Sequence, residues 1–272
     1  MSELVVSLTT IPSRIPHLGQ FLKSLKRQTL KPDRIELNVP AEYKRQDIGQ
    51  ADLNAIPSEF SVHICDDVGP ATKLLPTLQR YRDTDTTIVY CDDDRIYSDN
   101  WLERLTYFSA LNPANAISEE CMPVRMVPLA YRGINKNLKY RLRRVFSLGL
   151  YQPYALNRAK EPDVAEGFGG VLVKPTFFTD RIFDVPKECW AVDDIWISAN
   201  LHLAGHPIFF TDRPTKFGGV PLEIEGKDLG RGEDALTLSS IEGKSRHSLN
   251  YHAVRYCMEE LGVWSDYADL FK

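Results

Sequence analysis

Residues 87–94 read Thr-Ile-Val-Tyr-Cys-Asp-Asp-Asp, an apolar run that ends in three consecutive carboxylates. The run has the length and the β-branched content of a buried strand. Three like charges at a strand end repel one another and are costly to desolvate, and a bound cation would relieve that cost. Carboxylate oxygens suit Mg²⁺ or Mn²⁺, which in turn bind diphosphates. The stretch therefore predicts a cation site at a strand end, and the alternative interpretation is a solvated acidic turn.

The segments around this run alternate between strand and helix patterns. Strands are expected at 4–8, 35–39, 60–64 and 87–91. Amphipathic helices are expected over 15–25 and 71–81, and after the capping residues 98–100, where Trp101, Leu105 and Phe108 would be buried. This alternation predicts an α/β fold with a mainly parallel sheet flanked by helices. Ligands of such sheets lie beyond the carboxyl ends of the strands, where Asp92–Asp94 are expected.

The composition bounds the class of protein. The 272 residues are 43% hydrophobic and 26% charged, as in ordinary globular proteins, and the net charge of −4 gives no overall attraction to nucleic acid. The five cysteines lack CxxC spacing, so we expect reduced thiols. No signal peptide is expected, and no apolar run approaches the ~20 residues that span a bilayer. These features predict a cytoplasmic protein.

The middle of the chain carries a basic window over 125–160 without Asp or Glu. Its basic residues are Arg125, Arg132, Lys136, Lys139, Arg141, Arg143, Arg144, Arg158 and Lys160. Leu138, Leu142, Val145 and Phe146 give it an apolar side. Three interpretations stay open: a solvated surface helix, a segment over an anionic donor or acceptor, and peripheral contact of 136–146 with the inner face of a membrane.

Three features follow the basic window. A glycine-rich turn at 166–170 leads into a strand, and Gly169 and Gly170 permit close approach either to a ligand or within a tight turn. A region rich in Gly, Pro and charge, 213–245, is expected to be a mobile loop. A last helix is expected to bury Val254, Cys257, Met258 and Leu261.

A second acidic pair, Asp193 and Asp194, opens a predicted helix that ends at Gly205 and Pro207. Acidic residues at a helix start commonly cap amide groups and interact favourably with the helix dipole. The functional interpretation is that one carboxylate caps while the other acts as a general base. Adjacent carboxylates take different roles when their environments differ.

Two further segments carry polar groups that suit a nucleotide. In the segment 65–73, Asp67 is placed to accept hydrogen bonds from a base or ribose, and Lys73 to neutralise phosphate. The segment 244–247 places basic residues before the last helix, where His247 is a candidate metal ligand. Ordinary helix starts with exposed basic residues are the alternative in both places. His202 and His206 are spaced i,i+4 but lack the Glu of a zincin, so we expect no metal there.

Taken in order, these segments resemble the nucleotide-sugar glycosyltransferases of the GT-A fold over roughly residues 3–210. The opening Ser7–Ile15 is similar to the first strand and nucleotide-facing turn of that family, and 91–94 to its DxD element. The turn at 167–173 resembles the acceptor-side glycine strand. The stretch 192–196, Val-Asp-Asp-Ile-Trp, is similar to the acidic pair of the family 2 enzymes and to the Asp-Asp-Ile element of exostosin-like transferases.

The resemblance implies roles for the matching residues, and the residue chemistry above adds Lys73, Asp93 and His247. Donor-binding residues would be Thr9, Thr10, Arg14, Asp67, Lys73, Asp92 and Asp93, and acceptor-binding residues would be Gly169 and Gly170. Metal ligands for Mn²⁺ or Mg²⁺ would be Asp94, Asp92 and His247. Asp194 would be the base and Asp193 its catalytic neighbour. The family usually has Glu-Asp where this chain has Asp-Asp, so both the inverting and the retaining outcome stay open.

The sequence thus predicts a single glycosyltransferase domain, with a nucleotide-binding half at 1–112 and an acceptor-binding half at 113–272. The donor would be a nucleotide sugar, and the acceptor a hydroxyl of a glycan or lipid-linked saccharide. A sugar nucleotidyltransferase is an alternative, although residues 9–12, Thr-Thr-Ile-Pro, replace the Gly-rich loop of that class. A DxDxT phosphohydrolase fits less well because Arg95 and Ile96 follow Asp94. A non-catalytic basic module that binds glycans or membranes is the alternative outside enzymes.

Overall fold

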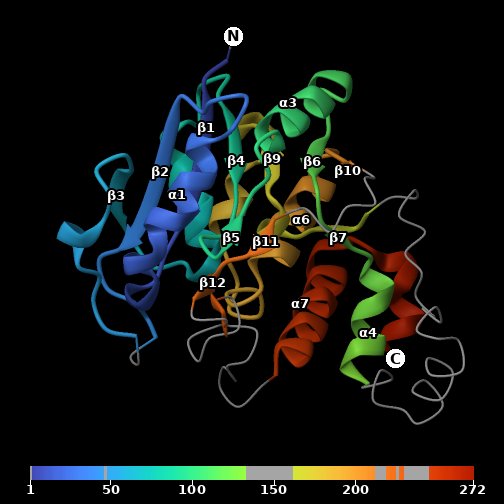
Figure 1. Cartoon of the computed structure of the whole chain (residues 1–272). Helices are drawn as coiled ribbons and strands as arrows, with labels where there is room; N and C mark the ends of the chain where they lie inside the picture. The colour runs from blue at the N-terminus through green and yellow to red at the C-terminus, as the bar shows by residue number, and fades with distance from the viewer. Residues whose placement is uncertain (1, 46–47, 133–161, 212–218, 225–226, 230–244) are drawn as a thin grey trace, which may run out of the picture.

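The computed structural model describes residues 2–45, 48–132, 162–211, 219–224, 227–229 and 245–272. The described part contains a seven-stranded sheet in the order β10-β6-β9-β4-β1-β2-β3 (Figure 1). Its strands are β1 (Leu4–Thr9), β2 (Arg34–Pro40), β3 (Ser61–Cys65), β4 (Thr87–Tyr90), β6 (Ala116–Ser118), β9 (Val171–Val173) and β10 (Ile208–Phe210). Strands β1 to β4 are parallel, and β9 runs antiparallel between β4 and β6. The predicted α/β fold with a mainly parallel sheet is confirmed.

Helices cover both faces of this sheet, and strand residues alternate between them. The described helices are α1 (Leu18–Lys26), α2 (Leu75–Arg80), α3 (Trp101–Leu111), α4 (Val127–Tyr131), α6 (Asp193–Leu203) and α7 (Arg246–Leu261). On β4, Val89 packs with α1 and α3, whereas Ile88 and Tyr90 pack with α2, α6 and α7. This alternation follows from the two-residue repeat of a strand, and it gives the protein a three-layer core.

Two helix predictions are modified by proline. The stripe at 15–25 begins as a 3₁₀ helix, η1 (Pro12–His17), which contains Pro16. The stripe at 71–81 is split into a 3₁₀ helix, η3 (Gly69–Lys73), and α2, in which Pro76 lies in the first turn. Proline lacks the amide hydrogen that a continuing helix needs, so each helix starts anew beside it. Asn100 opens α3 without a side-chain capping bond, because its Oδ1 accepts from Arg104 instead.

Further 3₁₀ turns and short strand pairs connect these layers. The 3₁₀ turns are η2 (Leu53–Ala55), η4 (Val124–Met126), η6 (Gly167–Gly169), η7 (Pro175–Phe177), η8 (Asp180–Phe183) and η10 (Ser265–Phe271). The paired strands are β5 (Arg95–Ile96) with β11 (Val220–Pro221), β7 (Cys121–Met122) with β8 (Val164–Ala165), and β12 (Glu223–Ile224) with β13 (Lys227–Asp228).

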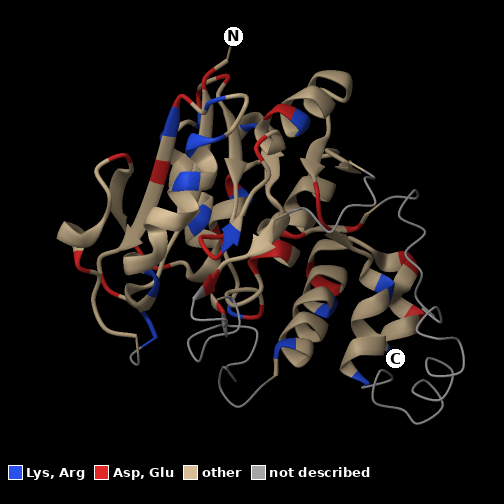
Figure 2. Cartoon of the chain, viewed as in Figure 1, with Lys and Arg blue, Asp and Glu red and all other residues tan. Residues whose placement is uncertain are grey.

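The prediction of a mobile loop at 213–245 is wrong for its described part. There β11, β12 and β13 pair as strands, and the amide of Leu222 donates to the Asp94 carbonyl over 2.8 Å. The rest of that region lies outside the described residues, as do 133–161 of the basic window. In Figure 2, acidic and basic positions of the ribbon lie close together near β5 and β11, below the central sheet.

Candidate active site

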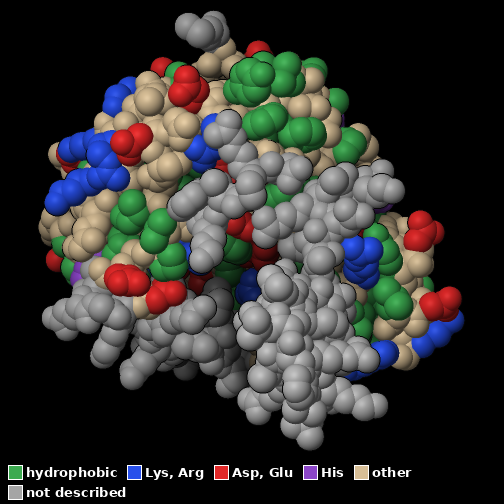
Figure 3. Space-filling model, turned by 45° about the vertical axis from the view of Figure 1, so that its right-hand side comes forward, with side chains coloured by type: hydrophobic (Ala, Val, Ile, Leu, Met, Phe, Trp, Pro, Cys, Tyr) green, Lys and Arg blue, Asp and Glu red, His purple; other side chains and the backbone are tan. Residues whose placement is uncertain are grey.

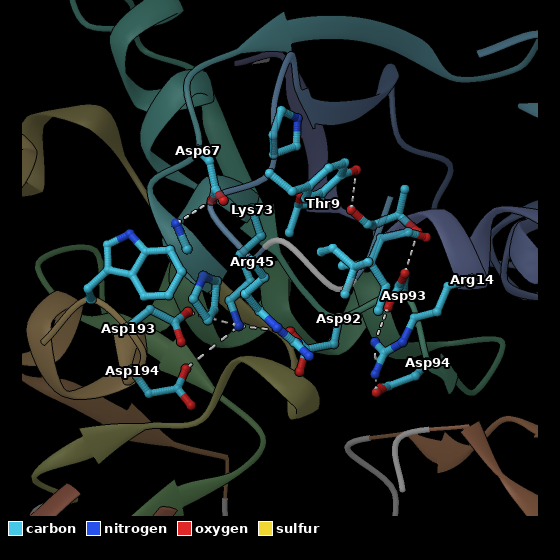
Figure 4. Close-up of a pocket in the computed structure, with 18 of the residues that line it drawn as sticks. Thr9, Arg14, Arg45, Asp67, Lys73, Asp92, Asp93, Asp94, Asp193 and Asp194 are labelled. Atoms are coloured by element: carbon cyan, nitrogen blue, oxygen red, sulfur yellow. Dashed lines mark hydrogen bonds and ion pairs between the residues drawn. The ribbon is translucent and has the colours of Figure 1, made fainter. Parts of the chain in front are cut away.

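A cavity of about 190 Å³ opens at the carboxyl ends of the parallel strands (Figure 4). Thr9 is the last residue of β1 and Pro40 the last residue of β2, while Asp67 lies just beyond β3 and Asp92 just beyond β4. Parallel strands present their carboxyl ends at one edge of a sheet, so residues far apart in the sequence meet there. The structure thus brings the predicted donor-binding residues Thr9, Thr10, Arg14, Asp67, Lys73, Asp92 and Asp93 to one cavity.

The three carboxylates at 92–94 have different surroundings. Asp93 is buried and accepts from the Thr10 hydroxyl and from Arg14 Nη1, both over 2.6 Å. Asp94 Oδ2 lies 3.1 Å from the same Arg14 nitrogen. Asp94 Oδ1 is buried without a hydrogen-bond partner, and Arg95 Nε lies 3.6 Å from it. Asp93 is therefore held by hydrogen bonds within the protein, whereas Asp94 Oδ1 has an ion pair with Arg95 but no hydrogen bond.

Asp92 points to the other side, toward a buried ammonium. Lys73 Nζ donates to Asp92 Oδ1 over 2.7 Å and lies 3.0 Å from Asp193 Oδ2 and 3.8 Å from Asp194 Oδ1. Figure 4 shows this ammonium among the three carboxylates. The sequence places Lys73 on a donor phosphate, whereas in the structure it lies between the two acidic clusters, with 4% of its surface exposed.

Burial and charge shift the pKa values of these groups. Burial, followed by Asp92, raises the pKa of Asp94 to about 6. Burial, with Asp193 and Asp92, raises the pKa of Asp194 to about 7 against the opposing Lys73 and Arg246. Burial opposes the charge of Lys73, but its three carboxylate neighbours raise the lysine pKa well above the ordinary value. Burial alone would raise the pKa of Asp92, yet Lys73, Arg14 and Arg95 lower it. The site therefore separates an ionised Asp92 from an Asp194 that titrates near neutrality.

Asp193 and Asp194 occupy the first two positions of α6, as expected. Val192 is the N-cap residue and no side chain caps the helix, so the expectation that one carboxylate caps is wrong. Asp193 is 2% exposed and is directed at Lys73 instead. Asp194 is more accessible, and its Oδ1 accepts from the amide of Gly167 over 3.0 Å. The pair therefore differs in exposure, as the two-role interpretation requires.

Asp67 shapes the far wall of the cavity. Its carboxylate accepts from the amides of Lys44 and Gly69, each over 2.7 Å. Gly69 has a positive φ of 69°, and a Cβ there would lie 2.4 Å from the Trp190 carbonyl oxygen. Trp190 and Tyr43 also line this cavity, although no sequence pattern indicated a binding role for either. A lone aromatic residue has no spacing that distinguishes a binding role from a core role.

A second, larger cavity of about 660 Å³ adjoins the first. Residues that line both cavities are Asp92, Asp94, Asp194 and Arg246. Its other walls are largely apolar and come from η4, α4, β8 and the start of α6. Glu166 also lines it, and burial, with Asp194 and Glu120, raises the pKa of Glu166 to about 8. Figure 3 shows acidic and basic side chains near the centre of the face that it presents.

The glycine turn 166–170 packs tightly against protein atoms. A Cβ on Gly169 would lie 2.7 Å from Glu120, and one on Gly170 would lie 2.2 Å from the Trp101 ring. The turn borders the second cavity through Glu166 and Phe168 rather than through these two glycines. Close packing thus explains why positions 169 and 170 are glycine. The acceptor-binding role of Gly169 and Gly170 stays a prediction.

A divalent cation fits this site only together with oxygens from a ligand. No group of three or more His, Cys, Asp or Glu side chains is arranged to hold a metal within the described ranges. The partnerless Asp94 Oδ1 and the nearby Asp92 still offer carboxylate oxygens, and Mg²⁺ is commonly bound by one or two carboxylates plus substrate phosphates. His247 lines the second cavity, and its assignment as a metal ligand stays a prediction.

Of the basic window 125–160, the structure describes only residues 125–132. Arg125 is exposed, and Arg132 donates to the carbonyls of Leu270 and Lys272 near the chain end. The proposed membrane-contact segment 136–146 lies outside the described residues. Among the helices that the structure describes, none has both the length and the apolar character needed to cross a bilayer.

The mainly parallel, helix-covered sheet, with a cavity beyond the carboxyl ends of its strands, defines an α/β protein. A solved structure of S. aureus TarS shares this fold. The chain is similar to S. aureus TarS 1–349 in complex with UDP-GlcNAc, with 12% identity and a TM-score of 0.51. That match covers 96% of this chain and 66% of the TarS chain.

A second TarS structure, S. aureus TarS 1–349, matches with 13% identity and a TM-score of 0.46, over 78% of this chain and 59% of that one. The chain thus spans about two thirds or less of these TarS chains. No protein-family model and no curated protein sequence matches it.

Proposed function

We propose that this protein transfers a sugar from a nucleoside-diphosphate donor to a hydroxyl group of an acceptor. The observation that carries the proposal is the meeting of two cavities at Asp92, Asp94 and Asp194. The first cavity has the charged lining that suits a nucleotide, and the second offers room for an acceptor. The fold shared with S. aureus TarS, which was crystallised with UDP-GlcNAc, supports the same donor class.

The donor diphosphate would lie beside Asp94 and Arg14. Asp94, with Asp92, would hold Mn²⁺ or Mg²⁺, because Asp94 Oδ1 is buried without a hydrogen-bond partner. A bound divalent cation would offset the negative charge of the departing diphosphate. Arg14 holds Asp93 and Asp94 in place with its guanidinium, and its charge adds to the positive potential that the phosphates meet.

Asp194 would act as the general base toward the acceptor. It lies at the junction of the two cavities, and its raised pKa of about 7 suits a group that gains a proton at neutral pH. In a direct displacement, the acceptor oxygen bonds to the anomeric carbon and its proton passes to Asp194. The bond from that carbon to the diphosphate breaks, and the diphosphate leaves with the electron pair. This route inverts the anomeric configuration, which product NMR would test.

The acceptor would extend from Asp194 into the second cavity. Its apolar walls, which include Met122, Leu129 and Phe168, suit a glycan that carries an apolar group, such as a lipid-linked saccharide. Peripheral contact with the inner face of a membrane through 136–146 would bring the protein to such an acceptor.

A thermal-shift panel of nucleoside diphosphates, with and without Mn²⁺, tests the donor assignment. A ligand at 100 times its Kd stabilises the folded state by about 2.7 kcal/mol, which corresponds to about 5 °C for a chain of this size. We expect one nucleoside diphosphate to give such a shift only with Mn²⁺ present. No shift with any nucleotide would contradict the proposal, and turnover of a sugar nucleotide would separate an enzyme from a binding module.

A further inference from the structure

Lys73 is the cation that connects the donor-side and acceptor-side carboxylates. Its ammonium lies 2.7 Å from Asp92, 3.0 Å from Asp193 and 3.8 Å from Asp194, and only 4% of the residue is exposed. An ammonium has three hydrogens to donate, and three carboxylates surround this one. A lysine that served mainly as a phosphate contact would direct its ammonium into the open cavity. Here the neighbouring acids already surround it.

Gly167 makes room for this arrangement. A Cβ built on Gly167 would lie 2.4 Å from Lys73 Nζ, 2.9 Å from Lys73 Cε and 3.2 Å from Asp194 Oδ1. The same glycine donates its amide to Asp194 Oδ1 over 3.0 Å. Any side chain at 167 would therefore press on the ammonium and on the adjacent Asp194 Oδ1. Its backbone conformation is open to other residues, because its φ lies outside the left-handed region.

We propose that Lys73 is a positioning residue for the Asp193–Asp194 pair, and that residue 167 is glycine because the ammonium occupies the space of its Cβ. The inference rests on the proposed function, in which Asp194 receives the acceptor proton. Lys73 and the Gly167 amide hold Asp194 Oδ1, so Oδ2 is the oxygen presented to the acceptor. Lys73 also pairs with Asp92. The donor-side and acceptor-side acids are therefore held at fixed positions relative to each other by one side chain.

Replacement Gly167→Ala tests this inference without changing any charge. The added methyl group meets the tip of a flexible side chain, so the protein can fold by moving Lys73 away from the acids. Displacements of about 1 Å near reacting groups cost about 100-fold in rate, so we expect kcat to fall about 100-fold. The acid limb of the kcat–pH profile should move up by about one unit, because a carboxylate that loses a nearby cation binds its proton more tightly.

Gly19→Ala is the matched control, since a Cβ on Gly19 in α1 meets no atom within 4 Å. It should keep the kcat and pH profile of the wild type. UDP affinity, measured by calorimetry with Mn²⁺, should change less than about threefold in Gly167→Ala. Wild-type kcat in Gly167→Ala, or a lower kcat with an unmoved acid limb, would overturn the inference.

Lys73→Arg separates positioning from simple charge. Arginine keeps the positive charge, but its planar head is too broad for the space beside Gly167, so we expect kcat at least about tenfold below wild type with UDP binding retained. If Lys73 contacted phosphate instead, UDP affinity would fall more than about tenfold, and that result would overturn the inference. Absence of transfer by the wild-type protein with every sugar nucleotide would instead refute the proposed function, and the inference with it.

Discussion

Asp94 differs from its two neighbours in what its oxygens contact. Asp92 accepts from Lys73 through Oδ1, and Asp93 accepts from Thr10 and Arg14. Only Asp94 among the three has a buried oxygen without a hydrogen-bond partner. Its ion-pair partner, Arg95 Nε, lies 3.6 Å away, beyond hydrogen-bond distance, so under the proposed function this oxygen would be the one that takes a cation.

Replacement Asp94→Asn should abolish metal-dependent nucleotide binding. Asparagine keeps the shape but not the negative charge that a hard cation requires. We expect the Mn²⁺-dependent part of the UDP thermal shift to disappear, with little change in the melting temperature of the free protein. Asp85→Asn is the matched control, because this carboxylate is 82% exposed and precedes the amino end of β4, whereas the cavity lies at the carboxyl end. A full Mn²⁺-dependent shift in Asp94→Asn would remove this residue from the metal site.

Replacement Asp194→Asn should leave nucleotide binding intact and lower transfer. A positioned general base contributes about 10²- to 10⁴-fold, so kcat should fall by that range while the UDP affinity stays near that of the wild type. Because the pKa of Asp194 is raised to about 7 and the base must be ionised, wild-type kcat should rise with pH and reach half its maximum near pH 7. Normal turnover by Asp194→Asn would exclude it as the base.

At the scale of single residues, sequence patterns located the acids but not their partners. A run of aspartates after an apolar strand, and an acidic pair at a helix start, are visible without coordinates. Which carboxylate contacts Lys73, and which is left unpaired, depends on the side-chain directions of η1, η3 and α6 together. Trp190 and Tyr43 formed no recognisable pattern, because a single aromatic residue occurs as readily in a hydrophobic core as in a binding site.

At the scale of elements, apolar periodicity located nearly every strand and helix of the first 112 residues. The strands differ from their expected bounds by one or two residues, which is the usual uncertainty of an element end. The pairing of β5 with β11 was missed, because strands of two residues have no periodicity to detect. That pairing matters, since it brings Leu222 onto the Asp94 carbonyl and holds the acidic turn.

The start of β9 depends on a glycine whose replacement should destabilise the protein. Gly170 has φ of 87°, and a Cβ would lie 2.2 Å from the Trp101 ring, whose Nε1 donates to the Gly169 carbonyl over 3.0 Å. We expect Gly170→Ala to lower the free energy of unfolding by about 3 kcal/mol, from backbone strain together with overpacking. Urea denaturation would measure it.

Gly262→Ala is the control that isolates the clash from the backbone strain. Gly262 ends α7 with φ of 69°, and a Cβ there meets no atom within 4 Å. Its replacement should therefore cost only the left-handed strain, about 1 kcal/mol. Equal losses in the two variants would show that Trp101 gives way without cost, contrary to the packing argument.

At the scale of the whole molecule, the order of strands decides where the chemistry is placed. Strands β1 to β4 align their carboxyl ends, and β9 inserts antiparallel beside β4, which brings the glycine turn and α6 against Asp92. The first cavity takes residues from both ends of the chain, including Arg246. The division into halves at 1–112 and 113–272 stays a prediction, and the donor cavity draws on both.

The stability of the protein without metal should depend on pH through its buried acids. Glu166 has an ordinary pKa of 4.5 and a folded-state pKa of about 8, so between these values the folded protein keeps a proton that the unfolded chain releases. This group's contribution to stability is therefore fully present below pH 4.5 and is lost as the pH rises toward 8.

Glu166→Gln removes this titration while keeping the shape of the side chain. We expect its free energy of unfolding, measured in urea with a chelator, to fall less steeply between pH 5 and about 8 than that of the wild type. The free energy of unfolding of the variant, relative to that of the wild type, should therefore increase as the pH rises. Parallel curves for the two proteins would show that Glu166 ionises normally in the folded state.

The sequence by itself determined the α/β class, the parallel strands and the two acidic clusters, because hydrophobic periodicity and charge placement are local properties of the chain. Only the tertiary structure decided that Lys73 lies between the clusters, that Gly167 makes room for it, and that two cavities meet at Asp194. The contacts of Lys73 with Gly167 and with Asp194 join residues 94 and 121 positions apart, and packing across the sheet edge, rather than any local pattern, brings such residues together. The acidic stretch at 87–94 therefore located the candidate site, and the fold gave each of its carboxylates different contacts.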